Sequence, residues 1–269
     1  MKLGALQMNS GADPQANLDA IRAGCEQAGA AGVDLLLLPE NALLMGRTER
    51  DKLAVAEDFG NGPMQADLAG MARQAGLHLV AGSFPLRVAD DPERVWSSAL
   101  VYAPDGECVA RYDKLHLFDV QAPDGQVYAE SRRFRAGENT PQCFDCQGVS
   151  VGLSICYDLR FPELYRALTA QGAELLLVPA AFTHATGQAH WDILLRARAV
   201  ENLAGVLAAN QCGTHPNGWR TWGHSLIADA WGAILAQADE QPGLITATMD
   251  LAAQRRRREE FPVLRHRRL

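Results

Sequence analysis

The chain has 269 residues, of which 48% are apolar, so it is long enough to bury a sizeable core as one large domain or two smaller ones. The formal net charge of −7 argues against a general affinity for nucleic acid or for an anionic membrane. The apolar start breaks at Asn9 and Ser10, too early for a signal peptide, and no stretch has the roughly 18 to 20 uncharged apolar residues that cross a bilayer. We therefore expect a cytoplasmic protein with no nucleic-acid partner and no membrane partner.

The first half of the chain alternates strand and helix patterns and then changes to a hairpin. The predicted elements are strands over residues 3–8, 33–38 and 77–84 and helices over 14–31 and 64–75. This order is a βαβ opening and implies a parallel sheet. Two strands between residues 95 and 112 flank Pro104-Asp105-Gly106, which favours an antiparallel hairpin. Residues 114–137 have little periodicity, and an unstructured loop of that length in a compact domain indicates a functional segment.

The second half repeats the alternation of strands and helices. The predicted elements are strands over residues 142–146, 149–155, 174–178 and 204–209, helices over 162–170 and 188–202, a hairpin over 223–237 and a closing strand over 244–249. Two segments look alike, VDLLLLPE at residues 33–40 and AELLLVPA at 173–180, and each is a buried strand that ends in proline. Two similar halves predict an α/β fold in which two sheets lie face to face with helices outside, without a linker between domains.

Six cysteines lie scattered along the chain, and we expect reduced thiols rather than a disulfide framework. Cys143 and Cys146 form CFDC, but zinc would need a second pair or histidines at ligand spacing, so we expect no metal and no other cofactor. The segment RRRREEFPVLRHRRL is interpreted as a solvated helix face followed by an extended arm, because the rest of the chain is acidic. We expect the arm, from about residue 255 to residue 269, to lie at a subunit interface.

Three polar residues, Glu40, Lys114 and Cys156, interrupt apolar patterns where predicted strands end. In open α/β sheets ligands bind at the carboxyl ends of strands, so the shared position favours a common site. Cys156 lies between a strand and the helix that begins at Pro162, and such a turn lifts a side chain out of the sheet. Each residue also has an ordinary alternative: a helix cap for the glutamate, a solvated side chain for the lysine and a small buried apolar residue for the cysteine.

The motifs around these residues resemble those of the nitrilase, or carbon–nitrogen hydrolase, superfamily. They are a glutamate after a buried strand in LLLLPE, a lysine before HLF in KLHLFD and a cysteine in CYDLRFPE, spread over nearly the whole chain. The resemblance implies one hydrolase domain over residues 1–269 with the four-layer αββα sandwich of that superfamily. It also implies a small-molecule amide as the substrate and a homodimer or larger homo-oligomer.

The resemblance implies a Glu-Lys-Cys triad, and the chemistry of these residue types agrees with it. A free thiol with a pKa of about 8.5 is mostly protonated at neutral pH, so Cys156 needs a base, for which Glu40 is the candidate. Lys114 and the backbone N–H of Tyr157 would stabilise the oxyanion that forms during acyl transfer. These four residues are therefore expected at one site.

Members of the family also carry a second glutamate in the loop after the lysine. We assign it to Glu130 in VYAES, with Glu138 as the alternative, and expect it to orient the lysine or the scissile group. Arg160 is a candidate for binding substrate carboxylates, although an ion pair with Glu163 is an alternative role. The candidates for the substrate pocket and its walls are Arg160, Phe182, His184, Trp191 and Arg196.

Motifs in the second half resemble the deaminated-glutathione amidase branch, notably TGQAHWD at residues 186–192, QCGTH at 211–215 and FPVLRHRR at 261–268. This resemblance implies a thiol amidase that converts deaminated glutathione to 2-oxoglutarate and cysteinylglycine. The ω-amidase branch shares much of the pattern, so hydrolysis of 2-oxoglutaramate is the alternative, and a non-catalytic binding or scaffold protein is a second one. Residues 120–131 and 182–191 lie outside the catalytic motifs and are expected to select the substrate.

Overall fold

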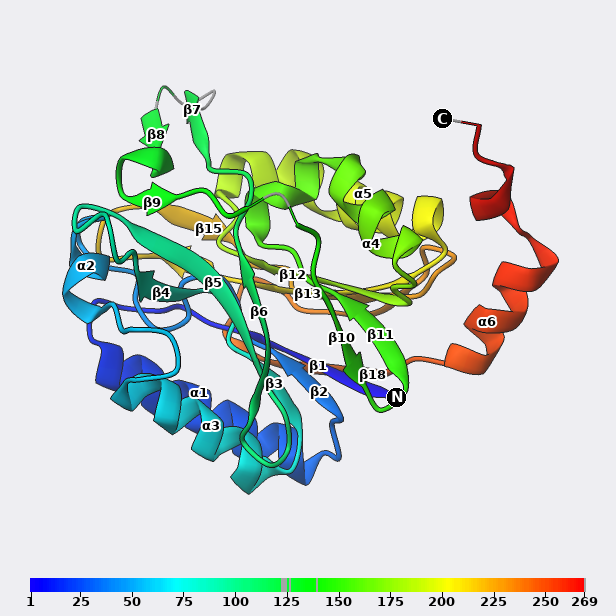
Figure 1. Cartoon of the computed structure of the whole chain (residues 1–269), viewed down its shortest axis with the longest axis horizontal. Helices are drawn as coiled ribbons and strands as arrows, with labels where there is room; N and C mark the ends of the chain where they lie inside the picture. Colours follow the sequence, from blue (N-terminus) through cyan, green and yellow to red (C-terminus); the bar gives the residue numbers. More distant parts are fainter. Residues whose placement is uncertain (122–124, 126, 139, 269) are drawn as a thin grey trace.

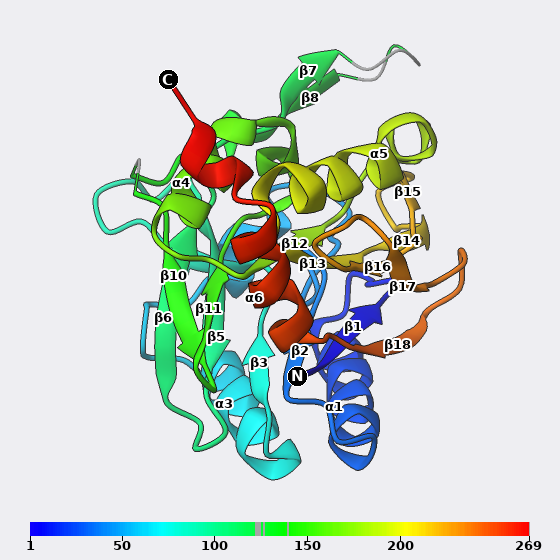
Figure 2. The ribbon, with the colours of Figure 1, turned by 90° about the vertical axis from the view of Figure 1, so that its right-hand side faces the viewer.

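Two β-sheets lie face to face in the computed structural model, and helices cover the outer face of each sheet (Figures 1 and 2). The structure describes residues 1–121, 125, 127–138 and 140–268. The four-layer αββα sandwich predicted from the sequence is therefore confirmed. The covering helices are α1 (Pro14–Ala30) and α3 (Pro63–Ala75) on the first sheet and α4 (Pro162–Ala170) and α5 (His184–Asn202) on the second.

The first sheet has the order β18-β1-β2-β3-β5-β4, and β6 and β9 also pair with β5. Strands β1, β2 and β3 run parallel, as the βαβ pattern predicted, and the predicted hairpin forms between β5 and β6. The closing strand β18 pairs antiparallel with β1. The bounds are β1 (Lys2–Gln7), β2 (Leu35–Leu37), β3 (His78–Val80), β4 (Phe84–Arg87), β5 (Val95–Tyr102), β6 (Cys108–Asp113), β9 (Phe134–Arg135) and β18 (Gly243–Thr248).

The second sheet has the order β10-β11-β12-β13-β16-β17. Strands β11, β12 and β13 form a parallel trio like that of the first sheet, which supports the internal repeat inferred from the two LLL segments. A separate hairpin joins β14 (Cys212–Thr214) and β15 (Arg220–Trp222). The bounds are β10 (Cys143–Cys146), β11 (Val149–Gly152), β12 (Leu175–Ala180), β13 (Gly205–Asn210), β16 (Leu226–Ala228) and β17 (Ile234–Gln237).

Strand β2 explains why an uninterrupted apolar run suits this fold. Leu35 and Leu37 face the core between the two sheets, whereas Leu36 and Leu38 face the core under α1 and α3. None of the four side chains has exposed surface. A central parallel strand that is covered on both faces needs no polar side, so the run of leucines fixes its place in the middle of the sandwich.

The predicted strand over residues 77–84 is wrong in extent, because the structure divides it into β3 and β4. Gly82 separates the two strands with φ of +69°, a left-handed conformation that glycine adopts without steric cost. Helix α5 begins at His184 instead of residue 188, because the backbone N–H of Gly187 already donates to Thr183 O at 2.7 Å. The break at Gly82 and the earlier start of α5 both follow from local backbone geometry, which the periodicity of apolar residues does not predict.

The segment over residues 114–137, expected as an unstructured loop, contains regular structure. Strands β7 (Asp119–Gln121) and β8 (Val127–Ala129) form a hairpin, followed by the 3₁₀ turn η1 (Glu130–Arg132) and by β9. β9 pairs in parallel with β5, so the segment returns to the first sheet. Residues 122–124 and 126 of the expected specificity segment lie outside the described residues.

The C-terminal part, α6 (Leu251–Glu260) and the 3₁₀ turn η3 (Val263–His266), leaves the sandwich at one end (Figure 1). Arg255 pairs with Glu174 at 2.7 Å, and Arg258 donates to Leu203 O at 2.7 Å, so α6 is fixed to the second half. Contact of this arm with a second subunit stays a prediction. Among the residues that the structure describes, no helix is both long and apolar enough to span a membrane.

A substitution at Gly82 tests whether the backbone before Glu40 depends on a glycine. A Cβ there would lie 2.1 Å from the carbonyl oxygen of Pro39, whereas at Gly76, with a similar φ of +65°, a Cβ meets nothing within 4 Å. Gly76→Ala should lower the free energy of unfolding by about 1 kcal/mol, the cost of left-handed alanine. Gly82→Ala should lower it by a further ~1 to 3 kcal/mol because of the clash. Urea denaturation measures both values, and equal losses in the two variants would contradict this account.

Candidate active site

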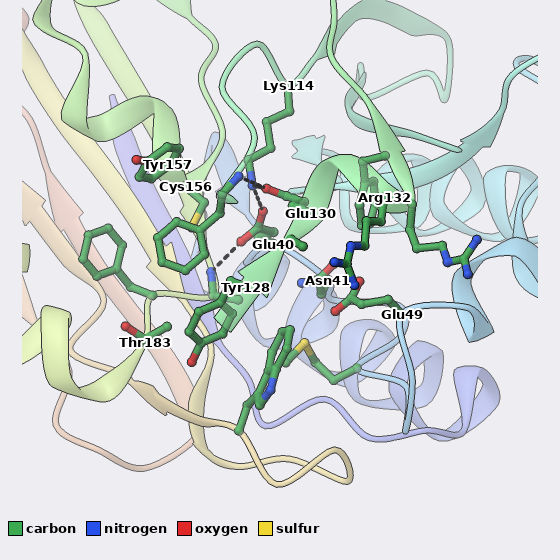
Figure 3. A pocket seen from close by; sticks show the side chains of 18 of the residues that line it. Glu40, Asn41, Glu49, Lys114, Tyr128, Glu130, Arg132, Cys156, Tyr157 and Thr183 are labelled. Carbon is green, nitrogen blue, oxygen red and sulfur yellow. Dashed lines mark hydrogen bonds and ion pairs between the residues drawn. The ribbon is translucent and has the colours of Figure 1, made fainter. Parts of the chain in front are cut away.

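A buried ammonium group lies between two carboxylates at the centre of the site (Figure 3). Lys114 Nζ is 2.7 Å from Glu40 Oε1 and 2.8 and 2.9 Å from the two carboxylate oxygens of Glu130. Lys114 is 2% exposed and Glu40 is 4% exposed. A buried charge is tolerated when it is paired and hydrogen-bonded, and here one cation meets two anions. The structure thus brings together the lysine and both glutamates selected from the sequence.

The end of strand β2 holds Glu40 at the junction of the two halves. Its carboxylate accepts a hydrogen bond through Oε2 from the backbone N–H of Ala181, at 3.0 Å. Ala181 directly follows β12, which is the counterpart of β2 in the second half. The two proline-terminated strands therefore end beside each other, and the peptide after one of them orients the carboxylate after the other.

Lys114 and Glu130 are held by the segment that follows β6. The backbone N–H of Lys114 donates to Ser97 O at 2.9 Å, and its carbonyl accepts from Gly137 N at 2.9 Å. Glu130 begins the η1 turn and accepts from the Phe118 N–H at 2.6 Å in addition to Lys114. The hairpin β7–β8 lies between these residues in the chain, so it returns the second glutamate to the lysine.

Cys156 occupies the turn predicted from the sequence. It begins the 3₁₀ turn η2 (Cys156–Arg160), which precedes α4, and its φ is +49°, a conformation that is rare for a residue with a side chain. Asp158 fixes the turn, because its fully buried carboxylate accepts from the Ile155 N–H at 2.8 Å and from Tyr112 OH at 2.7 Å. Backbone strain of this kind is typical of functional sites.

The same aspartate connects the cysteine turn to the segment after Lys114. Its other carboxylate oxygen accepts from the His116 N–H at 3.0 Å and lies 2.7 Å from His116 Nδ1. The His116 ring stacks on Phe161 with ring centroids 3.6 Å apart. One buried carboxylate thus holds the positions of both the lysine segment and the cysteine turn.

The electrostatics of the cluster place the proton on the thiol. Burial and the nearby Glu40 carboxylate raise the pKa of Cys156 well above its usual value. Burial also acts to raise the pKa of Glu40, but the charge and hydrogen bond of Lys114 outweigh it, so the net pKa is lowered. The two groups line the same cavity, and their interaction lowers the pKa of the Glu40 carboxyl and raises that of the thiol. The two pKa shifts therefore favour an ionised Glu40 beside a protonated thiol.

The pKa values of the other two groups of the cluster, Lys114 and Glu130, are both raised. Burial lowers the pKa of Lys114, but Glu130 and Glu40 more than offset this effect and raise it well above its usual value. The pKa of Glu130 is raised, chiefly by burial. Lys114 is therefore the charged cation of the cluster, held between the two carboxylates.

A cavity of about 350 Å³ opens onto the four residues. Of the residues expected at the pocket, Tyr157, Arg160 and Phe182 line it. Arg160 lies over the Phe182 ring at 5.1 Å and contacts His190 Nδ1 at 3.2 Å; no ion pair with Glu163 forms among the described residues. The other lining residues include Asn41, Glu49, Lys52, Tyr128, Arg132, Thr183, Thr186 and Trp219.

Three residues expected at the pocket, Trp191, His184 and Arg196, do not line this cavity. Trp191 is fully buried behind Phe182, with ring centroids 5.1 Å apart, and donates its indole N–H to His224 O at 2.8 Å. His184 packs against Trp222 and borders a neighbouring opening with Tyr128 and Thr183. Arg196 donates to Gly232 O at 2.8 Å.

The sequence analysis did not select Lys52 and Glu49, which both line the cavity. They belong to TERDKLAV, where a five-residue helix, α2 (Asp51–Val55), has too few turns to show an apolar face. No pattern in the sequence distinguishes this lysine from a solvated one. Among the described residues, no group of three or more His, Cys, Asp or Glu side chains is placed to hold a metal ion.

A family model described as carbon–nitrogen hydrolase matches residues 2–259. Deaminated glutathione amidase from Synechocystis sp. is 42% identical over 264 residues, which cover 98% of this chain and 96% of that protein. The structure of Saccharomyces cerevisiae Nit3, described as a member of branch 10 of the nitrilase superfamily, is similar with a TM-score of 0.89 and 26% identity, and the match covers 100% of this chain and 97% of that one.

A third similar protein is the amidase from Nesterenkonia sp. AN1. The structure of one variant, described as showing Michael addition of acrylamide at the active site cysteine, has a TM-score of 0.80 and 31% identity over 98% of both chains. The family model and these relatives cover almost every residue of the sandwich described above. The chain therefore belongs to the carbon–nitrogen hydrolase family, within the nitrilase superfamily, and is a hydrolase that acts on amides.

Proposed function

We propose that the enzyme hydrolyses deaminated glutathione to 2-oxoglutarate and cysteinylglycine, with Cys156 as the nucleophile. The observation that carries the proposal is the buried cluster in which Lys114 pairs with Glu40 and Glu130 beside the thiol. A purely structural site gains nothing from a thiol, an ionised base and a buried ammonium at one cavity. The family membership supports the same chemistry over a non-catalytic scaffold.

The first half-reaction transfers the acyl group to sulfur. Glu40 accepts the thiol proton while sulfur attacks the amide carbon, because its lowered pKa leaves it ionised at the same cavity as the thiol. The oxyanion is stabilised by the Lys114 ammonium and by the Tyr157 N–H. The C–N bond then breaks, and Glu40 returns its proton to the departing amine of cysteinylglycine.

The second half-reaction hydrolyses the thioester. Glu40 takes a proton from a water molecule that attacks the thioester carbon, and the same oxyanion donors act again. When the C–S bond breaks, the thiolate regains that proton and 2-oxoglutarate leaves. Glu130 does not exchange protons in this scheme; its two contacts with Lys114 and its bond from Phe118 hold the ammonium in place.

The substrate assignment rests on the relatives and on the charge of the cavity. A protein 42% identical to this chain is named deaminated glutathione amidase. The substrate has a carboxylate at each end, and Arg160 and Lys52 both line the cavity. We place the 2-oxo acid part beside Tyr157, Arg160 and Phe182. The ω-amidase substrate 2-oxoglutaramate has the same acyl part and remains the alternative.

We also propose a homo-oligomer. Apolar side chains are exposed on α5 and near α6, where Ile193 is 68%, Val200 47%, Trp231 53% and Phe261 50% exposed. A second copy that covers these side chains would remove their apolar surface from water. We further propose a cytoplasmic location, because the six cysteines are free thiols and a reducing compartment keeps thiols free.

Replacement of Glu40 by glutamine tests the base. The Glu40→Gln variant keeps the shape of the side chain but cannot accept the thiol proton, so kcat/KM should fall by about 10²- to 10⁴-fold. Glu130→Gln should cause a smaller loss, because one amide oxygen can still accept from Lys114. Steady-state kinetics on deaminated glutathione measure both. A larger loss for Glu130→Gln than for Glu40→Gln would reverse the assigned roles.

A substrate comparison tests the proposed function. The enzyme should hydrolyse deaminated glutathione with a higher kcat/KM than 2-oxoglutaramate, since only the former has a dipeptide to fill the cavity. Release of 2-oxoglutarate, followed with a coupled dehydrogenase, reports both reactions. A clear preference for 2-oxoglutaramate would show an ω-amidase and would reject our first choice.

A further inference from the structure

Lys52 is a second buried ammonium group in the catalytic cavity, and the mechanism above does not use it. Its side chain is 9% exposed, and the residue lines the same cavity as Cys156. The ammonium lies 3.3 Å from Glu49 Oε2 and 4.7 Å from the centre of the Phe134 ring. Glu49 is more accessible, with 31% of its side chain exposed. A lysine with three N–H donors has capacity here for a second anion.

Burial should make Lys52 a stronger binding partner for a carboxylate than an ordinary surface lysine. A charge taken out of water is costly unless a partner compensates it. The partly exposed carboxylate of Glu49 compensates the Lys52 charge only in part. The Phe134 ring adds a weak cation–π contact on one side. A carboxylate that entered the cavity would find an ammonium that is already desolvated and oriented, so binding would cost little further ordering.

The position of Lys52 indicates which end of the substrate it meets. Figure 3 shows Glu49 and Asn41 on one side of the Glu40–Lys114–Glu130 cluster, and Tyr157 and Thr183 on the other. Lys52 pairs with Glu49 and belongs to the first side, and its positive charge acts on Glu40. In the proposed mechanism Glu40 protonates the departing amine. With the acyl group placed beside Tyr157, the leaving group extends to the opposite side of the cluster, the side of Glu49.

We propose that Lys52 binds the C-terminal carboxylate of the leaving amine, and so selects amides of a dipeptide over primary amides. This inference rests on the proposed function, because cysteinylglycine supplies that carboxylate. An extended chain spans at most about 3.6 Å per residue, so the carboxylate reaches roughly 7 Å beyond the scissile nitrogen. Lys52 lines the same cavity as the proposed base Glu40, and its charge acts on that carboxylate. An amidase that releases only ammonia has no group for it to bind.

The test varies both Lys52 and the substrate carboxylate that it is proposed to bind. Deaminated glutathione and its C-terminal glycinamide differ only in that carboxylate. Wild-type enzyme should prefer the acid by on the order of 10- to 100-fold in kcat/KM, mainly through KM, the range for a buried hydrogen bond to a charged group. In Lys52→Met this preference should fall to about threefold or less, and Lys52→Arg should restore most of it. A preference that Lys52→Met leaves intact would overturn the proposal.

Two further variants separate recognition from general effects. Arg50→Met removes an exposed positive charge beside the same short helix without facing the cavity, so it should keep the wild-type preference. Glu49→Gln removes the carboxylate that competes for the ammonium, so its preference for the acid should rise. If Lys52→Met lowers kcat/KM equally for the acid and the glycinamide, Lys52 acts only through Glu40 or the fold, and the proposal is wrong.

A binding measurement distinguishes failure of this inference from failure of the proposed function. Isothermal titration of wild type and Lys52→Met with cysteinylglycine and cysteinylglycinamide requires no turnover. Tighter binding of cysteinylglycine by wild type, lost in Lys52→Met, supports the subsite even if deaminated glutathione proves a poor substrate. Equal binding of cysteinylglycine by both proteins rejects the subsite, whatever the substrate of the enzyme.

Discussion

The buried ammonium of Lys114 is the constraint on which the site depends. It is almost without solvent and needs Glu40 from the end of β2 and Glu130 from the η1 turn, so three distant parts of the chain must meet. Loss of one partner of a buried ion pair leaves an uncompensated charge and is strongly destabilising. The segment after β6 must therefore bring Glu130 back to Lys114, the lysine at which it begins.

The sandwich brings these groups together because each half contains the same kind of buried parallel strand. β2 and β12 are buried parallel strands, and the peptide after β12 donates to the carboxylate after β2. Glycines make room for the backbone next to two residues of the cluster, Glu40 and Lys114. A Cβ at Gly82 would meet Pro39 O, just before Glu40, and a Cβ at Gly137 would lie 2.2 Å from Asp113 O, just before Lys114. Backbone placement, more than side-chain packing, thus determines the geometry of the site.

Much of this arrangement could be predicted from the sequence, because strands that are buried on both faces have a strong apolar signal and end in polar residues. The cysteine turn and the parallel trios followed from that signal. The structure of the β7–β8 segment did not, since it depends on the contact of Glu130 with Lys114. Lys52 escaped prediction for a similar reason: its burial comes from Phe134 and the cavity wall, not from its own short helix.

In the proposed mechanism Cys156 carries the acyl group as a thioester. The most direct measurement is mass spectrometry of acid-quenched enzyme during turnover of deaminated glutathione, with peptide mapping of the adduct. The account predicts a 2-oxoglutaryl group on Cys156, and no adduct in the Cys156→Ala variant. An adduct on another cysteine, or turnover by Cys156→Ala at the wild-type rate, would contradict it.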